Sequence, residues 1–194
     1  GLALHTKISG VAHNGVENEA AAAALVRDYL GYFLDREVAA GAAGDQDELL
    51  QLIPANLRTP YDIVPVIEQL ADTGSFFQIQ PDYGRTIVTG LARLNGHAVA
   101  VLANQPAVMA GTIDATGGEK AADFITRMDG FGLPMLFLAD NPGVMAGSAA
   151  ERAGTLRATA RMFRAQTTMK SPKLHVTLRK AFGFGGFVMA QNPF

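Results

Sequence analysis

The chain has 194 residues, the size of one domain or one domain with an extension, and is long enough to bury a substantial core. Hydrophobic residues make up 48% and charged residues 18%, which excludes an intrinsically disordered chain. A net charge of −2 gives no general attraction to nucleic acid or anionic lipid. Without cysteine the chain has no disulfide, thiolate nucleophile or cysteine-bound zinc.

The two ends carry their own signals. The chain begins with Gly1 rather than methionine, and residues 1–10 lack the basic and apolar regions of a signal peptide. It stops at Phe194, shortly after an apolar stretch that resembles the beginning of a helix. The longest apolar runs are far shorter than the roughly 20 residues that span a bilayer. We expect the chain to be part of a longer polypeptide.

Helical periodicity dominates the first third of the sequence. A capping box at Asn14 predicts a helix that ends near Arg36, with an apolar face on Leu25, Tyr29 and Phe33. Small and polar residues then predict a linker, with a short packed turn near its end.

The next helix is predicted from a proline. Thr59 and Pro60 form an N-cap and a first helical position, and Gly74 provides the stop. Its apolar stripe consists of Ile63, Val66, Ile67 and Leu70.

Strands and helices alternate in the remaining chain. Residues 86–93 and 97–103 predict two strands joined by an Asn95-Gly96 turn, which is a strong hairpin signal because both turn positions need a positive φ. A capping box at Thr116 predicts a helix with an apolar side. That side is formed by Phe124, Ile125, Met128 and Phe131.

Two further strands and one more helix complete this pattern. A buried strand is predicted over residues 134–139, a helix from Ser148, and a second buried strand over residues 173–178. The last helix presents Leu156, Ala160, Phe163 and Thr167 on one face. The order β-β-α-β-α-β predicts an α/β fold with helical crossovers.

Three glycine-bearing loops, at 104–111, 140–147 and 181–186, each connect a strand to a helix. Backbone N–H groups in such loops can stabilise negative charge. Each loop alone is an ordinary connection between a strand and a helix. Three such loops at the same ends of neighbouring strands favour a ligand site.

Common nucleotide, hydrolase and metal motifs are missing. There is no P-loop and no nucleophile elbow, and Gly183, Gly185 and Gly186 do not complete a dinucleotide fingerprint. The four histidines have no metal-ligand spacing, and we interpret His97 and His175 as structural.

Each of two groups of basic residues has two possible roles. Arg157, Arg161 and Arg164 share one side of a predicted helix, where a solvated face is the default and an anionic partner the alternative. The second group flanks the third loop and predicts either a phosphate or carboxylate contact or a solvent-exposed strand end. It consists of Lys173, Arg179 and Lys180.

Residues 62–191 resemble the middle of the carboxyltransferase (β) subunits of biotin-dependent acyl-CoA carboxylases of the propionyl-CoA carboxylase type. The resemblance is carried in order by NGHAVAVLANQP, GLPMLFLADNPGVMAG and RKAFGFGGFVMA, and LHTKISGVA near the N-terminus resembles the end of the family's first half. It implies a crotonase-like α/β fold of two ββα-spiral halves. Residues 1–36 would then end the first half, 37–57 would link, and 58–194 would form most of the second, incomplete at its C-terminal end.

The resemblance also implies a reaction. Carboxylate passes from carboxybiotin, carried on a separate domain, to the α-carbon of an acyl-CoA through an enolate. Two backbone oxyanion holes stabilise the charge, so neither a metal nor a side-chain acid or base is required. The implied partners are a biotin carboxylase/biotin carboxyl carrier subunit and further carboxyltransferase subunits in a homo- or hetero-oligomer, a hexamer in this family, with no nucleic acid and no membrane. The implied location is the bacterial cytoplasm, or else the mitochondrial matrix.

The family motifs assign site residues to this chain. The N–H groups of Phe184 and Gly185 align with the biotin-side oxyanion hole, although the family has glycine at the first of these positions, so the Phe184 ring narrows the pocket. The residues aligned with biotin binding are Asn141, Pro142, Gly143, Gly147, Gly183 and Gly186. The residues aligned with the substrate pocket are Asn104, Gln105, Pro106 and Phe187. Phe187 replaces an aspartate often found in members acting on propionyl-CoA, which leaves acyl length open.

Two alternatives keep the same fold. The first is a subunit of a biotin-dependent acyl-CoA decarboxylase or transcarboxylase, whose loops are shared. The second is a non-catalytic scaffold paralogue in a mixed complex, a reading that the Phe184 substitution keeps open.

Overall fold

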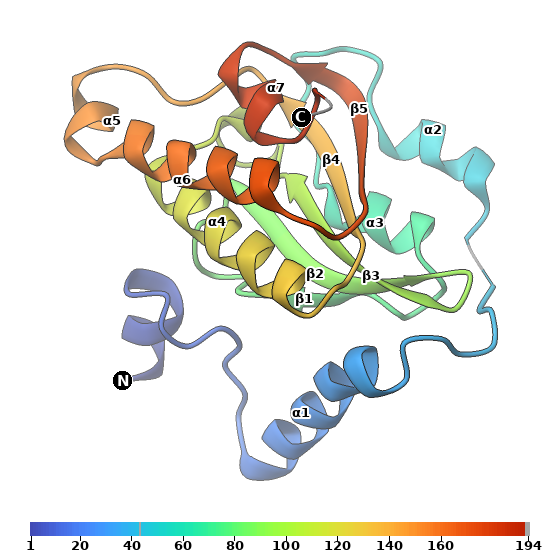
Figure 1. Ribbon diagram of the computed structural model, residues 1–194. Coiled ribbons are helices and arrows are strands. Elements are labelled where there is room, and N and C mark those ends of the chain that lie inside the picture. The colour runs from blue at the N-terminus through green and yellow to red at the C-terminus, as the bar shows by residue number, and fades with distance from the viewer. Residues whose placement is uncertain (43, 193–194) are drawn as a thin grey trace.

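The computed structural model describes residues 1–42 and 44–192, built around a five-stranded sheet (Figure 1). The strands follow the sheet order β1-β2-β3-β4-β5. The first three are antiparallel, and β4 and β5 continue parallel to β3. Their bounds are β1 Phe77–Ile79, β2 Ile87–Leu94, β3 His97–Asn104, β4 Met135–Asn141 and β5 Lys173–Ala181. Strands from 86, 97 and 134 were therefore predicted correctly, whereas the three-residue β1 was not predicted.

Helices cover both faces of the sheet (Figure 1). The α-helices are α1 Glu19–Leu34, α2 Leu49–Leu52, α3 Val64–Leu70, α4 Ala115–Gly130, α5 Ser148–Arg152, α6 Thr155–Thr168 and α7 Phe184–Val188. Short π or 3-10 turns are η1 Leu4–Ile8, η2 Gln46–Glu48 and η3 Met109–Gly111. Helices α4 and α6 pack together on one face, and α3 lies on the other, next to α2. None of the helices in the described part of the chain has the length and apolarity to cross a membrane.

Alternating side chains divide the core into two layers. In β2, Ile87 and Leu91 pack beneath α4 and α6, whereas Val88 and Ala92 pack toward α3. This follows from the strand period of two, which sends successive side chains to opposite faces. Both faces of β2 are apolar because helices cover both.

The predicted hairpin is confirmed, and a buried carboxylate stabilises its turn. Asn95 and Gly96 have φ of 51° and 83°. Their N–H groups donate to Asp72 at 2.9 and 2.7 Å. Burial alone would raise the pKa of Asp72, but these bonds and a third from Gly41 favour the carboxylate and lower it.

Three helices do not begin at the residue predicted from the sequence. The first begins after an Asn18 cap rather than at Asn14, whose side chain instead bonds Gln78 and Gln80. The helix expected from Thr59 begins at Val64 and ends at Leu70, although its apolar stripe is confirmed. The third is capped by Asp114 rather than Thr116. In the first and third helices a different polar residue, Asn18 or Asp114, accepts the first N–H groups. At Thr59 the backbone instead bonds Arg179.

The helix predicted from Ser148 is interrupted and rotated. Gly154 adopts a left-handed conformation between α5 and α6. On the face predicted from the sequence, Leu156 is 71% exposed and Ala160 is also exposed. The buried side consists instead of Thr155, Ala158, Thr159, Met162 and Gln166. The strand after it also differs, because β5 is an edge strand that exposes Leu174 rather than a strand covered on both faces.

The predicted linker has structure of its own. Residues 37–57 contain η2 and α2, with the latter at the predicted packed turn. The linker contacts the hairpin through Val38, whose N–H donates to Gly96 O. The segment up to α1 lies below the sheet in Figure 1.

Candidate functional site

The three glycine-bearing loops follow β3, β4 and β5, whose carboxyl ends lie at one edge of the sheet because these strands are parallel. A cavity of about 550 Å³ opens among them. Pro106 and Pro142 from the predicted site line it, together with Phe182 from the third loop. Its fourth side is formed by residues 57–60.

Two buried asparagines connect the first two loops. Asn104 Oδ1 accepts hydrogen bonds from Asn141 Nδ2 at 2.9 Å and from the Asp140 N–H at 3.1 Å. Asn141 Oδ1 accepts the Gly143 N–H at 3.0 Å, which shapes the start of the second loop. Both side chains are fully buried, so they hold the loops rather than face the cavity.

The third loop reaches the second through glycine. A Cβ added at Gly185 would lie 2.1 Å from Asn141 Oδ1 and 2.7 Å from Gly143 Cα. A Cβ on Gly186 would lie 2.0 Å from Gln191 Oε1. At Gly185 the close contact is with the Gly143 backbone, so only glycine fits. At Gly186 the nearest atom belongs to the flexible Gln191 side chain, and the Ala181 carbonyl follows at 3.0 Å. Gly147 is the N-cap of α5, with a φ of 107°.

The predicted donors stand at the beginning of α7. Phe184 and Gly185 are its first two residues, so their N–H groups have no acceptor within the helix. Gly183 precedes them with a φ of 54°, which turns the chain into this helix. The Phe184 ring packs against Phe163, with the ring centroids 5.6 Å apart. That contact directs the ring into the core cluster beside α6.

The remaining predicted substrate-pocket residues differ in their surroundings. The Gln105 side chain forms hydrogen bonds inside the protein. Its Oε1 accepts the Ile63 N–H, and its Nε2 donates to Asp62. It therefore fixes the beginning of α3. Phe187 is 38% exposed on α7, and its carbonyl accepts a bond from Gln166.

A buried charged cluster adjoins this cavity, which two of its residues, Arg179 and Lys180, help to line, and the sequence did not predict it. Asp140 is fully buried and accepts bonds from Tyr61 Oη at 2.9 Å and Arg179 Nε at 2.6 Å. Lys180 Nζ lies 3.6 Å from its other oxygen. Arg179 also stacks on the Tyr61 ring, with Cζ 4.6 Å from the centroid. We call these four residues the Asp140 cluster.

For Arg179 and Lys180 the solvent-exposed alternative was therefore wrong, whereas contact with a phosphate or carboxylate stays a prediction. Their side chains are largely buried and pair with Asp140, and both residues also line the cavity. Lys173 Nζ donates to the carbonyl and side chain of Gln166. Arg179 lies 39 positions from its partner Asp140, so adjacency to the loop gave no signal of this pairing.

A second cavity, of about 670 Å³, lies between residues 9–13 and α4. At its base Lys120 is 2% exposed and donates to the carbonyls of Gln80, Tyr83 and Ile87 at 2.7–2.9 Å. Burial lowers the pKa of Lys120 to about 7.

Among the described residues there is no group of three or more histidine or acidic side chains arranged for an ion. As predicted, His175 has a structural role, bonding Met189 O and Thr177. His97 is exposed and pairs with Glu37. The predicted arginine face on α6 is exposed, and Arg161 pairs with Asp123.

The fold and loops agree with comparisons to known proteins. The family described as the carboxyl transferase domain matches residues 1–193. The propionyl-CoA carboxylase carboxyltransferase subunit of Haloferax mediterranei is 38% identical over 99% of this chain and 39% of its own length. The methylmalonyl-CoA decarboxylase subunit alpha of Veillonella parvula is 36% identical over 94% of this chain and 38% of its own. A transcarboxylase 12S crystal structure, described as a hexamer, superposes with a TM-score of 0.93 at 32% identity, covering 97% of this chain and 39% of that one.

The chain belongs to the carboxyl transferase domain family. Its α/β architecture is the crotonase-like fold of the solved carboxyltransferases, as the resemblance predicted. The chain spans about 39% of the length of these relatives.

Proposed function

We propose that the protein is the carboxyltransferase component of an acyl-CoA carboxylase, which moves carboxylate from carboxybiotin to the α-carbon of an acyl-CoA. The observation that carries the proposal is the convergence of three loops on one cavity, the third of which carries the first N–H groups of α7, with no acceptor inside that helix. Family membership gives the reaction class.

The cavity suits the ring system of biotin. Its volume of about 550 Å³ lies within the usual range for small-ligand sites, and prolines, an alanine pair and Phe182 provide most of its lining. Carboxybiotin, carried on a separate domain, supplies the carboxyl group. When that group leaves, negative charge grows on the ureido oxygen, and the N–H groups of Phe184 and Gly185 would stabilise it.

The other predicted site residues would act through the backbone. Asn141, Pro142 and Gly143 would form the facing wall, because Asn141 fixes the Gly143 N–H. Gly147, Gly183 and Gly186 would allow the turns and close contacts that bring the loops together. Pro106, which lines the cavity, would border the acyl group, with Asn104 and Gln105 holding that border in place. Phe187, exposed on α7, would contribute from outside the lining of this cavity.

The domain organisation and assembly are part of this proposal. We infer that residues 1–36 end one crotonase-like half, 37–57 link, and 58–194 form most of the second. A separate biotin carboxylase/biotin carboxyl carrier subunit would deliver carboxybiotin, and carboxyltransferase subunits would assemble as a hexamer in the cytoplasm. The hexamer described for the transcarboxylase 12S structure supports this assembly.

A decarboxylase or transcarboxylase subunit is the second candidate, favoured by the Veillonella relative. Both candidates transfer carboxylate between biotin and a CoA ester, and dependence on a membrane partner or on an oxaloacetate donor subunit separates them. A non-catalytic scaffold would show no transfer at all until mixed with an active paralogue.

A single peptide N–H can be removed to test the oxyanion hole. Phe184→Pro deletes the N–H at the first helical position, where proline is tolerated, and Gly183 lies outside the helical region that a following proline disfavours. Phe184→Ala removes the same ring but keeps the N–H. In the complete protein, with malonyl-CoA or methylmalonyl-CoA and free biotin, we expect kcat of the proline variant to be about 10²–10³-fold below that of the alanine variant.

The kcat values are compared only for variants that keep the wild-type melting temperature. Equal kcat values for the two variants would show that the Phe184 N–H is not a donor. No transfer by the folded wild-type protein across a broad acyl-CoA panel would overturn the proposed reaction.

A further inference from the structure

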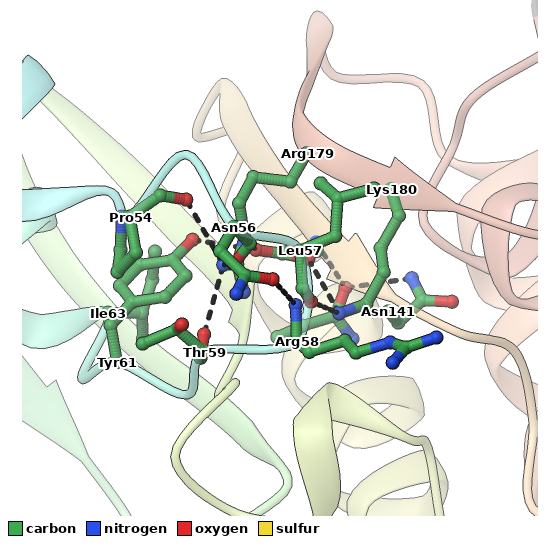
Figure 2. Close-up of polar contacts among 12 residues, drawn as sticks. Pro54, Asn56, Leu57, Arg58, Thr59, Tyr61, Ile63, Asn141, Arg179 and Lys180 are labelled. Carbon is green, nitrogen blue, oxygen red and sulfur yellow. Dashed lines mark hydrogen bonds and ion pairs between the residues drawn. The ribbon is translucent and has the colours of Figure 1, made fainter.

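Residues 54–60, which we call the strap, cross one side of the cavity without an anchor in the core (Figure 2). Residues 55–60 are exposed, and the only large apolar side chain among them, Leu57, is 49% exposed. Apolar burial therefore contributes little to holding this segment in place.

Two buried cations hold the strap by its backbone. Arg179 Nη1 donates to the carbonyls of Pro54, Asn56 and Thr59 at 3.3, 2.9 and 3.0 Å. Lys180 Nζ donates to Leu57 O at 3.1 Å. Figure 2 shows these side chains extending from β5 to the strap. Hydrogen bonds from charged donors are stronger than neutral ones.

An irregularity in the sheet brings both cations to the same side. Between β4 and β5 the pairing shifts, so that Ala139 pairs with Thr177 but Asn141 pairs with Ala181. Neighbouring side chains in a regular strand point to opposite faces. Here Arg179 and Lys180 both reach Asp140, at 2.6 and 3.6 Å. A bulge redirects side chains in this way, often beside an active site.

We propose that Arg179 and Lys180 are positioning residues, which fix the strap as a wall of the cavity and thereby set how tightly the cavity binds its ligand. Asp140 holds the two cations in place. Residues 57–60 of the strap face the loops across the cavity, so a displaced strap leaves the ligand without one wall. Naming this ligand as the ring system of biotin rests on the proposed function.

Arg179→Lys in the complete protein tests the proposal. Lysine keeps a positive charge, but its single nitrogen cannot stand both where Nε bonds Asp140 and where Nη1 bonds the strap carbonyls. We expect the biotin dissociation constant, measured by NMR titration, and KM for biotin to rise about tenfold. Because the loss affects binding and not the reacting atoms, kcat should change less than about threefold. Amide hydrogen exchange should accelerate at residues 55–59 alone.

Two further variants make the result decisive. Lys180→Met removes the single bond to Leu57 O and should give the same changes to a smaller extent, which serves if Arg179→Lys does not fold. Arg164→Lys, on the exposed side of α6, is the matched control and should change neither exchange nor binding.

Each outcome has one reading. Unchanged exchange in the strap overturns the positioning role, and faster strap exchange with unchanged biotin affinity overturns its link to binding. Faster exchange throughout the protein marks a general stability effect and also overturns the proposal. Failure of the wild-type protein to bind biotin counts against the proposed function, whereas strap exchange still decides whether the two cations position it.

Discussion

Asp140 is the charged centre of the Asp140 cluster. It is fully buried, and its carboxylate is the common partner of Tyr61, Arg179 and Lys180. Burial raises the pKa of Tyr61, and the negative charge of Asp140 raises it further, so the phenol stays protonated and donates. The carboxylate therefore balances two cations that would otherwise be buried beside each other.

Replacing Asp140 should be costly. Asp140→Ala leaves Arg179 and Lys180 buried without their counter-charge, and we expect the free energy of unfolding to fall by about 3–5 kcal/mol. Asp123→Ala is the control, because Asp123 forms an exposed ion pair with Arg161 at 3.2 Å. That change should cost less than about 1 kcal/mol. Urea denaturation measures both, and similar midpoints for the two variants would contradict the assigned role of Asp140.

At the scale of elements, the β2–β3 hairpin shows how a local signal acquires a tertiary role. Gly96 has the positive φ that its turn needs, and it also lies against the linker. A Cβ there would be 2.2 Å from Val38 O. Gly74 has a similar φ of 74° but open space around its Cα. Comparing substitutions at the two glycines therefore distinguishes the cost of backbone strain from the cost of a steric clash.

We expect Gly96→Ala to destabilise the protein more than Gly74→Ala. Both substitutions place alanine in the left-handed region, at a cost of roughly 1–2 kcal/mol. Only Gly96→Ala also displaces a backbone carbonyl, which should add at least about 1 kcal/mol. Thermal unfolding of both variants checks the order, and equal losses would show that the linker moves aside freely.

At the scale of the molecule, Lys120 joins α4 to the segment that contacts the N-terminal residues. Gln80, whose carbonyl accepts from Lys120, also donates through Nε2 to Gly10 O and through its N–H to Asn14. The carbonyl of Tyr83 also accepts from Lys120, and the Tyr83 ring lies against Gly10. The acids and bases around the same cavity are His13, Glu119, Asp123, Arg127 and Arg161.

The lowered pKa of Lys120 predicts a pH dependence of stability. Below pH 7 the lysine is protonated in both the folded and unfolded protein, but between about 7 and 10.5 the unfolded chain retains a proton that the folded protein has released. Stability from this group therefore rises with pH across that interval. Urea unfolding at pH 6, 7.5 and 9 should show the rise in the wild-type protein and in an exposed-lysine control, Lys7→Met, but not in Lys120→Met. Parallel profiles for all three would contradict it.

Local chemistry was sufficient where neighbouring residues decide the structure. The Asn95-Gly96 turn, the apolar run of β4 and the three loops are set by φ preferences and by continuous burial, both of which are visible in sequence. The same ordered loops gave the family resemblance, which the comparisons confirmed.

Only the tertiary structure decided features that depend on distant partners. Strand β1 has three residues and exists because it pairs with β2. Helix α6 buries Ala158 and Thr159 because Gly118 of α4 lets its backbone approach closely there. The sequence by itself determined the hairpin, the α/β order and the loops, through short-range backbone preferences. The Asp140 cluster required the fold, because Arg179 meets a carboxylate 39 positions away, at a bulge that no local pattern encodes.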